Sequence, residues 1–288
     1  MQSVITILKI IPIALIIIWG LFNPAKIPAP IIPLTVGTGH SFPTAISQGL
    51  LSALFAFEGW IVVTNLANEV KNPEKDLSRA IILGLSAITL IYVLINYTFM
   101  TVLPIDQLTN NNNAAFQASM KLFGQFGGKL VTVGILISVY GAVNAFMLTG
   151  MRTPYILAQD NLLPFSNKIG KANIHTGVPV VGAFIVDAIA IVMILLGNFT
   201  VLTDMLVFVM WTFNTMLSVA VIILRKREPE LKRPFKVPWY PIIPIISVIG
   251  GIFIVVSTII NQFVLSIIGI GLTLLGLPIY YYMQKKNN

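Results

Sequence analysis

The fold is decided by stretches such as residues 241–262, PIIPIISVIGGIFIVVSTIINQ, in which no side chain is charged. As an α-helix, a stretch of this length rises about 33 Å, which is enough to cross roughly 30 Å of hydrocarbon. Eight such stretches lie near residues 4–22, 46–66, 81–103, 128–150, 179–197, 201–224, 241–262 and 264–283. Barrel strands would instead alternate weakly over about ten residues. The sequence therefore predicts an all-α, polytopic membrane protein with one transmembrane domain over residues 1–288.

The composition excludes an ordinary water-soluble domain. Of the 288 residues, 56% are hydrophobic and 10% are charged, against roughly 25% charged in an average soluble domain. The mean hydropathy is +0.89. The net charge of +8 lies in short loops between apolar runs, which favours membrane orientation over nucleic-acid binding. The absence of cysteine excludes disulfides, thiolate metal sites and cysteine nucleophiles.

Lysine and arginine are divided unevenly between the two sides of the predicted bundle. With loops assigned alternately to the two sides, one side takes Lys71, Lys75, Arg79, Arg152, Lys168, Lys171, Arg225, Lys226, Arg227, Lys232, Arg233, Lys236, Lys285 and Lys286. The other side takes Lys26, Lys121 and Lys129, and Lys9 lies inside the first span. Because cytoplasmic loops carry an excess of these residues, we expect both termini in the cytoplasm of a multi-pass plasma (cell) membrane protein.

The outward loops are predicted at residues 23–45 and 104–127. Repeated prolines in PAKIPAPIIP, residues 24–33, favour an extended surface connector. The run 110–113 consists of four asparagines and is typical of a polar turn. No phosphate-binding glycine loop or HExxH motif occurs, and the two histidines, His40 and His175, fall in loops. We therefore expect no enzyme activity, no metal and no cofactor.

We single out three ionisable residues inside predicted spans, where a charge is costly and usually has a function or a partner. Lys9 is close enough to the start of its span for its side chain to extend to the cytoplasmic headgroups. The sequence alone favours neither this position nor a buried functional role. Glu58 precedes Gly59, which is compatible with either a broken helix or a continuous helix that turns Glu58 toward a neighbour. For Asp187 we expect structural pairing with another helix.

The span 128–150 combines polar and small side chains. Ser138, Asn144 and Thr149 can hydrogen-bond to other helices, and glycines such as Gly134 and Gly141 allow close helix approach. Both features are typical of packing between membrane helices.

Three segments together resemble the amino acid–polyamine–organocation (APC) superfamily, and most closely its branch of L-type and bacterial serine/threonine exchangers. FAFEGWIVVTNLANEVKNPEKDLSRAI, residues 55–81, resembles the sixth helix and the loop after it. GAVNAFMLTGMRTPYILAQDNLLP, residues 141–164, is similar to the eighth helix and its end. LRKREPELKRPFKVPWYPIIP, residues 224–244, is similar to the basic loop before the eleventh helix.

The resemblance implies a LeuT-like fold of two inverted five-helix repeats plus two helices, with substrate at broken first and sixth helices. The eight spans would correspond to helices five to twelve, so the first four would be absent. The implied function is amino acid transport by exchange or a proton-linked mechanism, from a truncated or split C-terminal portion. A separate chain could then supply the missing helices. The alternative is a non-transporting membrane remnant or an assembly subunit.

The resemblance also implies roles for individual residues. Phe55 matches the aromatic gate of the sixth helix, and the backbone of Ala56 and Phe57 would meet the substrate's amino group. Glu58 falls beside them without a defined role. Lys9 matches a fifth-helix lysine whose ammonium occupies the cation position of sodium-coupled relatives, with Ser138 as a weaker candidate to line the same region. The resemblance places two further candidates in the pathway, in the tenth helix: Trp211 and Asn214.

Overall fold

The computed structural model describes residues 2–23, 27–28, 41–61, 63, 70, 72–109, 111–231, 233 and 235–287. Within these ranges every regular element is a helix, so the predicted all-α class is confirmed. Lys26, His40, most of the proline-rich connector and the distal part of the span 46–66 lie outside the described residues. Contacts divide the chain into two compact units, residues 1–35 with 82–148, and residues 36–81 with 149–288. The predicted single domain stays a prediction.

Each of the eight predicted spans contains an apolar helix. Five described segments are long and apolar enough to cross a membrane, and three shorter apolar helices accompany them. The corresponding helices are α1 (Gln2–Phe22), α2 (Phe42–Ala56), α3 (Pro73–Val102), α5 (Ala114–Gly150), α8 (Val180–Leu196), α9 (Phe199–Arg227), α10 (Ile242–Asn261) and the pair α11 (Phe263–Leu274) and α12 (Gly276–Asn287). Pro278 has no N–H for the carbonyl of Leu274, which explains why the last span is divided there.

The predicted loop 104–127 is wrong over most of its length. It contains the short helix α4 (Ile105–Leu108) and the first turns of α5. Gly124 interrupts α5 with φ 67° and ψ −158°, a conformation that glycine adopts without a steric penalty. The helix before Gly124 therefore runs in a different direction from the helix after it. Within the asparagine run the described residues Asn112 and Asn113 form a turn, as predicted, and the Asn111 side chain bonds to the Gln107 carbonyl oxygen (2.6 Å) and to Gln117 (2.9 Å).

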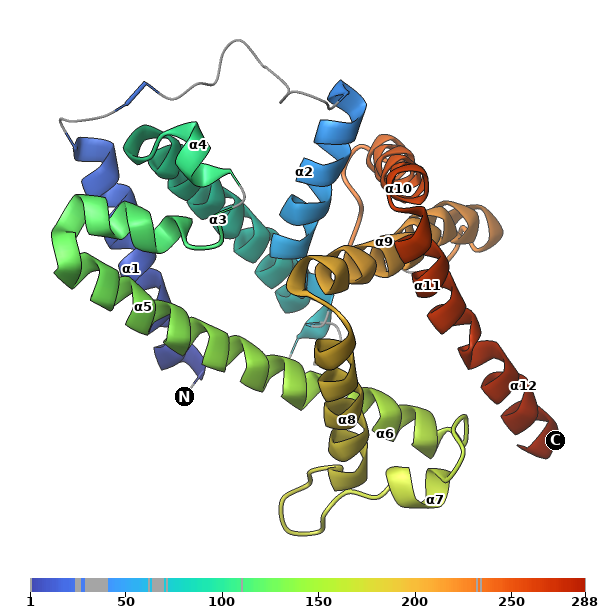
Figure 1. The fold of residues 1–288 in the computed structure, drawn as a ribbon. Helices are drawn as coiled ribbons and strands as arrows, with labels where there is room; N and C mark the ends of the chain where they lie inside the picture. Colours follow the sequence, from blue (N-terminus) through green and yellow to red (C-terminus); the bar gives the residue numbers. More distant parts are fainter. Residues whose placement is uncertain are drawn as a thin grey trace. The chain divides into compact units, whose positions relative to one another are not determined.

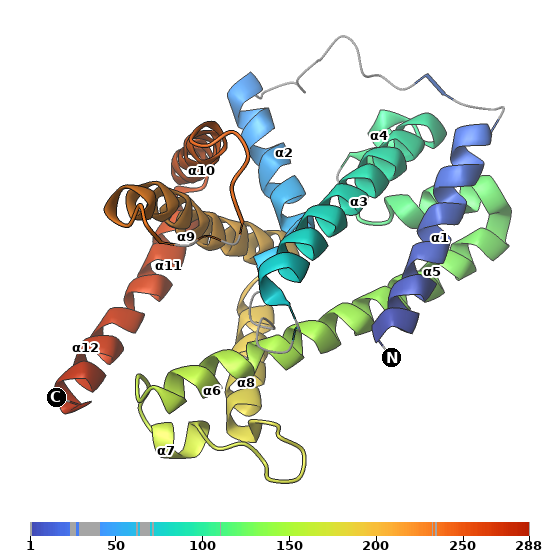
Figure 2. The same ribbon diagram turned by 180° about the vertical axis from the view of Figure 1, so that it is seen from behind.

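The first unit holds α1, α5 and most of α3 close together (Figure 2). A Cβ added at Gly134 would lie 2.6 Å from the ring of Pro12, and one added at Gly20 would collide with Thr98. Glycine at these positions therefore lets α1 approach both neighbours closely, as predicted for Gly134.

The second unit is organised around α9 (Figure 1). The helices α2, α10 and α11 all pack against α9, and the buried residues Leu51, Val207 and Ile254 form a core between α2, α9 and α10. The helices α6 (Arg152–Gln159), α7 (Ser166–Ile169) and α8 form a separate set of contacts within the same unit. This arrangement positions the end of α2 against α9.

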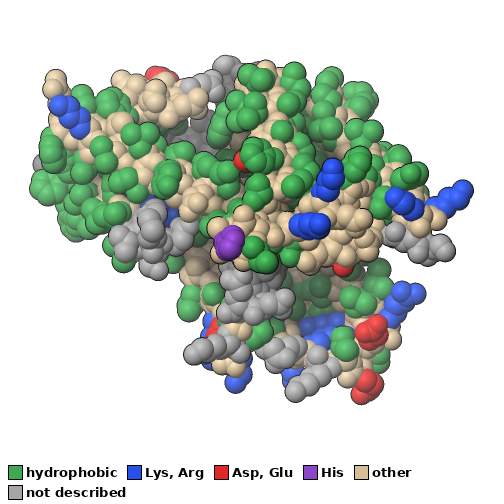
Figure 3. Space-filling model, turned by 90° about the horizontal axis from the view of Figure 1, so that it is seen from below, with side chains coloured by type: hydrophobic (Ala, Val, Ile, Leu, Met, Phe, Trp, Pro, Cys, Tyr) green, Lys and Arg blue, Asp and Glu red, His purple; other side chains and the backbone are tan. Residues whose placement is uncertain are grey.

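Large apolar side chains cover much of the helix surfaces. Leu195 and Leu196 at the end of α8 are 79% and 81% exposed, and green hydrophobic side chains predominate on the face in Figure 3. A water-soluble protein rarely exposes apolar surface on this scale. The exposed surface fits a bilayer as solvent.

Candidate functional site

The helix α2 ends inside the predicted span 46–66. Its last residue is Ala56, after which the Phe57 N–H donates to the carbonyl oxygens of Ala53 and Leu54 (both 3.2 Å). The Glu58 N–H donates to Phe55 (3.1 Å), and Gly59 adopts φ 105°. Side chains rarely allow this φ, so glycine permits the turn. The continuous-helix alternative is therefore wrong, and the span is broken where the motif FAFEGW lies.

Phe55 lies in the last turn of α2 and faces α9. Its ring packs against the core of Leu51, Val207 and Ile254, and it meets Phe199 edge-on with ring centroids 5.8 Å apart. Trp211 packs against the same core from α9. The structure therefore brings the predicted residues Phe55 and Trp211 to one cluster.

The other predicted residues near the break differ in exposure. Ala56 is exposed, whereas Phe57 and Glu58 are half-buried. Asn214 is also half-buried and lies three residues after Trp211 on α9. Residues with this spacing are neighbours on a helix surface, so the α2 break and this part of α9 belong to one region of the second unit.

Polar side chains of α9 are satisfied mainly within the helix itself. The hydroxyls of Thr212, Thr215 and Ser218 donate to the carbonyl oxygens four residues earlier at 2.8, 2.6 and 3.0 Å. The Ser218 hydroxyl also lies 2.9 Å from that of Ser247 on α10. Most of these hydroxyls therefore need no partner from another helix.

Lys9 and Ser138 belong to the first unit and are both half-buried. Pro12 of α1 meets Gly134 of α5, and Trp19 meets Phe123 with ring centroids 5.8 Å apart, so the two helices run antiparallel. Lys9 lies one turn before Pro12, and Ser138 lies one turn after Gly134. The antiparallel register therefore places Lys9 and Ser138 at the same level of the helix pair.

Two further acidic residues lie in the predicted spans. Asp187 on α8 is half-buried, and the structure shows no hydrogen bond or ion pair between it and another described residue; its pairing stays a prediction. Asp204 on α9 accepts a hydrogen bond from Gln262 at 3.0 Å. Our sequence reasoning missed Asp204, although an acid within the predicted span 201–224 was a usable signal. Among the described residues, no three His, Asp or Glu side chains are placed to hold a metal ion.

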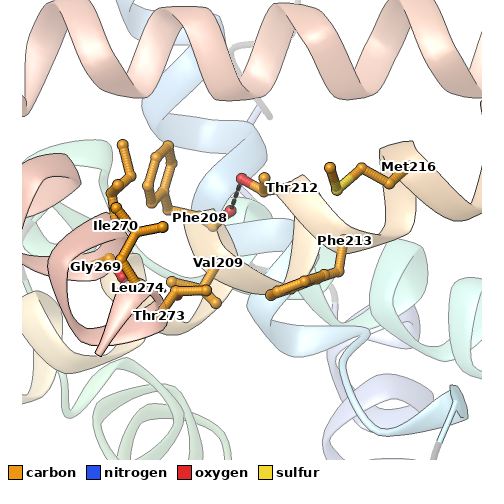
Figure 4. A pocket seen from close by; sticks show the side chains of 9 residues that line it. All are labelled: Phe208, Val209, Thr212, Phe213, Met216, Gly269, Ile270, Thr273 and Leu274. Atoms are coloured by element: carbon orange, nitrogen blue, oxygen red, sulfur yellow. Dashed lines mark hydrogen bonds between the residues drawn. The ribbon is translucent and has the colours of Figure 1, made fainter. Parts of the chain in front are cut away.

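A separate apolar crevice of about 200 Å³ lies between α9 and α11. The side chains in Figure 4 that line it include Phe208, Phe213 and Met216. Its two hydroxyls are already bonded within their own helices, Thr212 to Phe208 (2.8 Å) and Thr273 to Gly269 (2.9 Å). An amino acid needs polar partners for its ammonium and carboxylate groups. This crevice is therefore a poor candidate for the substrate site.

The family model described as amino acid permease matches residues 1–282. The serine/threonine exchanger SteT of Bacillus subtilis (strain 168) is 36% identical over 295 residues, covering 99% of this chain and 64% of that protein. The human cystine/glutamate transporter is 27% identical over 280 residues, covering 97% of this chain and 55% of that protein. The mouse Asc-type amino acid transporter 1 is 25% identical over 248 residues, covering 86% of this chain and 45% of that protein.

This chain thus spans less than two thirds of the length of these relatives. The match to the family model nevertheless extends over nearly the whole chain, and it agrees with the apolar helices and the APC resemblance. The chain is a multi-pass membrane protein that belongs to the amino acid permease family of the APC superfamily.

Proposed function

We propose that this chain takes part in the transport of amino acids across a membrane, by exchange or by proton-linked alternating access. The observation that carries the proposal is the end of α2 at Ala56. Fifteen helical residues rise only about 22 Å, which is less than the hydrocarbon thickness. Backbone groups beyond a helix end inside a membrane must find polar partners, and a bound substrate can provide them.

We propose a substrate site around this break. Phe55 closes the site against water, and the backbone of Ala56 and Phe57 contacts the substrate's ammonium group, with Glu58 beside it. Trp211 and Asn214 contribute from α9. The support is the shared cluster of Phe55 and Trp211 and the position of Asn214 one turn further along α9.

We propose that Lys9 provides the fixed or titrating positive charge of the coupling site, with Ser138 lining the same region. The antiparallel contact of α1 with α5 supports the pairing, because it puts both half-buried residues at one level. A cationic side chain inside a membrane is costly and usually has a function or a partner. A lysine at this position can therefore take part in coupling.

We further propose that the complete transporter includes the first four family helices, on the same polypeptide or on a separate chain. The coverage of at most 64% of the relatives named above supports this proposal. We place the assembly in the plasma membrane with both termini cytoplasmic. The three basic residues in the last turn of α9 support this orientation.

Uptake of labelled amino acids into proteoliposomes tests the transport proposal. One preparation holds this chain alone, and a second holds the chain co-expressed with a segment that supplies family helices one to four. We expect uptake only in the second preparation. Uptake by the chain alone would overturn the need for further helices, and failure of both preparations with folded protein would favour the non-transporting alternative.

The gate is tested by Phe55→Ala in the preparation that transports. Loss of the ring opens the site to water, so we expect uptake to fall on the order of tenfold. Phe213→Ala is the matched control, because it removes the same ring from the α9 crevice. Equal losses in the two variants would reject a specific role for Phe55.

The coupling site is tested by Lys9→Gln, with Lys129→Gln as the control for a lysine that is exposed on α5. We expect Lys9→Gln to remove the stimulation of uptake by an imposed proton or substrate gradient and the control to keep it. Unchanged stimulation in Lys9→Gln would remove Lys9 from the coupling mechanism.

A further inference from the structure

The segment that joins α9 to α10 combines basic and aromatic residues at the bilayer surface. It connects two apolar helices of a multi-pass membrane protein, so it lies where they leave the hydrocarbon. From Arg225 to Lys236 the sequence has six basic residues against two acidic ones, Glu228 and Glu230. The segment therefore carries a clear excess of positive charge beside the membrane.

Two of its arginines hold the segment in shape. The Arg233 guanidinium donates to the carbonyl oxygens of Glu228 (2.6 Å) and Leu231 (2.9 Å), which closes the chain onto the end of α9. A cation at this position also complements the negative end of the helix dipole. The Arg225 guanidinium lies 4.0 Å from the ring centroid of Tyr240, just before α10. The segment is thus fixed at both ends by its own basic residues.

Apolar side chains project from this fixed segment at intervals of four residues. Leu231, Phe235 and Trp239 are 57%, 43% and 79% exposed. Lys226 and Lys236 are also exposed, and the ammonium group of neither forms a hydrogen bond or ion pair with another described residue. Exposed apolar tips and unengaged lysines therefore occupy the same short segment.

We infer that this segment is a contact site for anionic phospholipid headgroups. Trp239, Phe235 and Leu231 enter the interfacial layer, where tryptophan in particular is favoured. Lys226 and Lys236 bind the headgroup phosphates. Near an anionic surface each basic residue contributes attraction that weakens with salt. A bilayer fits better than a soluble acidic protein, because both ends of the segment continue directly into membrane helices.

The test uses the full chain with Trp19, Trp60 and Trp211 replaced by phenylalanine, so that Trp239 is the only tryptophan and can be excited selectively over the tyrosines. The protein is reconstituted either in phosphatidylcholine or in an equal mixture of phosphatidylcholine and phosphatidylglycerol. Lipids brominated on the acyl chains report how deeply Trp239 lies. We expect quenching to rise about twofold or more with phosphatidylglycerol, and the rise to shrink at high salt. Equal quenching in the two lipid compositions would by itself overturn the inference.

A matched pair of variants identifies the charges responsible. Lys226→Gln with Lys236→Gln should remove most of the rise, and arginine at both positions should keep it. Lys285→Gln with Lys286→Gln removes the same amount of charge from the last turn of α12 and should leave the rise intact. Equal losses in the two glutamine pairs would assign the effect to net charge and overturn a site in this segment. A soluble acidic peptide can also be added to the protein in phosphatidylcholine. If the peptide changes the Trp239 fluorescence and phosphatidylglycerol does not, the lipid site is overturned in favour of a protein partner.

Discussion

The helices α2 and α9 pack against each other but meet the membrane in different ways. With 29 residues α9 rises about 43 Å and can cross the hydrocarbon alone, whereas the 15 residues of α2 rise about 22 Å. The polar hydroxyls of α9 bond within the helix, whereas α2 ends in a turn that leaves helical geometry at Gly59. The continuous helix packs against α2, whereas α2 ends inside its predicted span, where we propose that the substrate binds.

The strongest test of this contrast is Gly59→Ala. The side chain cannot easily adopt φ 105°, and the strain costs about 1–3 kcal/mol or moves the turn. Because small misplacements in a site can cost about 100-fold, we expect uptake by the complete assembly to fall on that order.

The matched control is Gly49→Ala on the same helix, where an added Cβ meets nothing within 4 Å. In a helix alanine is favoured over glycine by about 0.5–1 kcal/mol, so this variant should keep uptake and unfold no more easily. Normal uptake by Gly59→Ala would remove the turn at Gly59 from the proposed site.

The packing of α9 is tested by the adjacent glycines of α10. A Cβ at Gly251 would collide with the Thr215 hydroxyl, whereas a Cβ at Gly250 meets nothing within 4 Å. We expect Gly251→Ala to lower the free energy of unfolding by about 1–3 kcal/mol, and Gly250→Ala to leave it unchanged or higher. Detergent unfolding curves measure both values. Similar curves for the two variants would contradict the close approach of α9 and α10.

The smallest effect is expected where α9 and α10 share a hydrogen bond. A double-mutant cycle of Ser218→Ala and Ser247→Ala should give a coupling energy of about 0.6 kcal/mol, because hydrogen bonds between membrane helices are individually weak. Ser257→Ala on α10 should not couple to Ser218→Ala. A coupling near zero for the serine pair would show that their contact does not stabilise the helix pair.

The sequence predicted the apolar helices well because length and hydropathy act over some twenty residues at a time. It predicted the end of α2 only as one of two alternatives, because a glycine is tolerated inside many membrane helices and its φ depends on the surrounding fold. The early start of α5 was missed for a similar reason: Gly124 and the asparagine run are typical of loops, yet the intervening residues form helix. Local composition cannot distinguish these outcomes.

For the candidate site, the sequence identified Phe55 and Trp211, which the structure brings to one cluster. The common level of Lys9 and Ser138 was beyond sequence reasoning from residues alone, since it depends on the antiparallel contact of Pro12 with Gly134. The charge of Asp204 inside a predicted span was a signal, but its partner, Gln262, is 58 residues away in the chain and could not be identified from local sequence.

The hydroxyls of α9 have a consequence for the synthesis of the protein. During translation α9 leaves the ribosome before α10 and α11 do. Thr212 and Thr215 already have their hydrogen-bond partners within the helix, so they do not oppose early insertion into lipid. Asp204 must wait for Gln262, which follows α10. The two kinds of polar residue on one helix thus imply an order of assembly. The helix α9 inserts into the membrane first, and the hydrogen bond between Asp204 and Gln262 forms only after α10 has crossed the membrane.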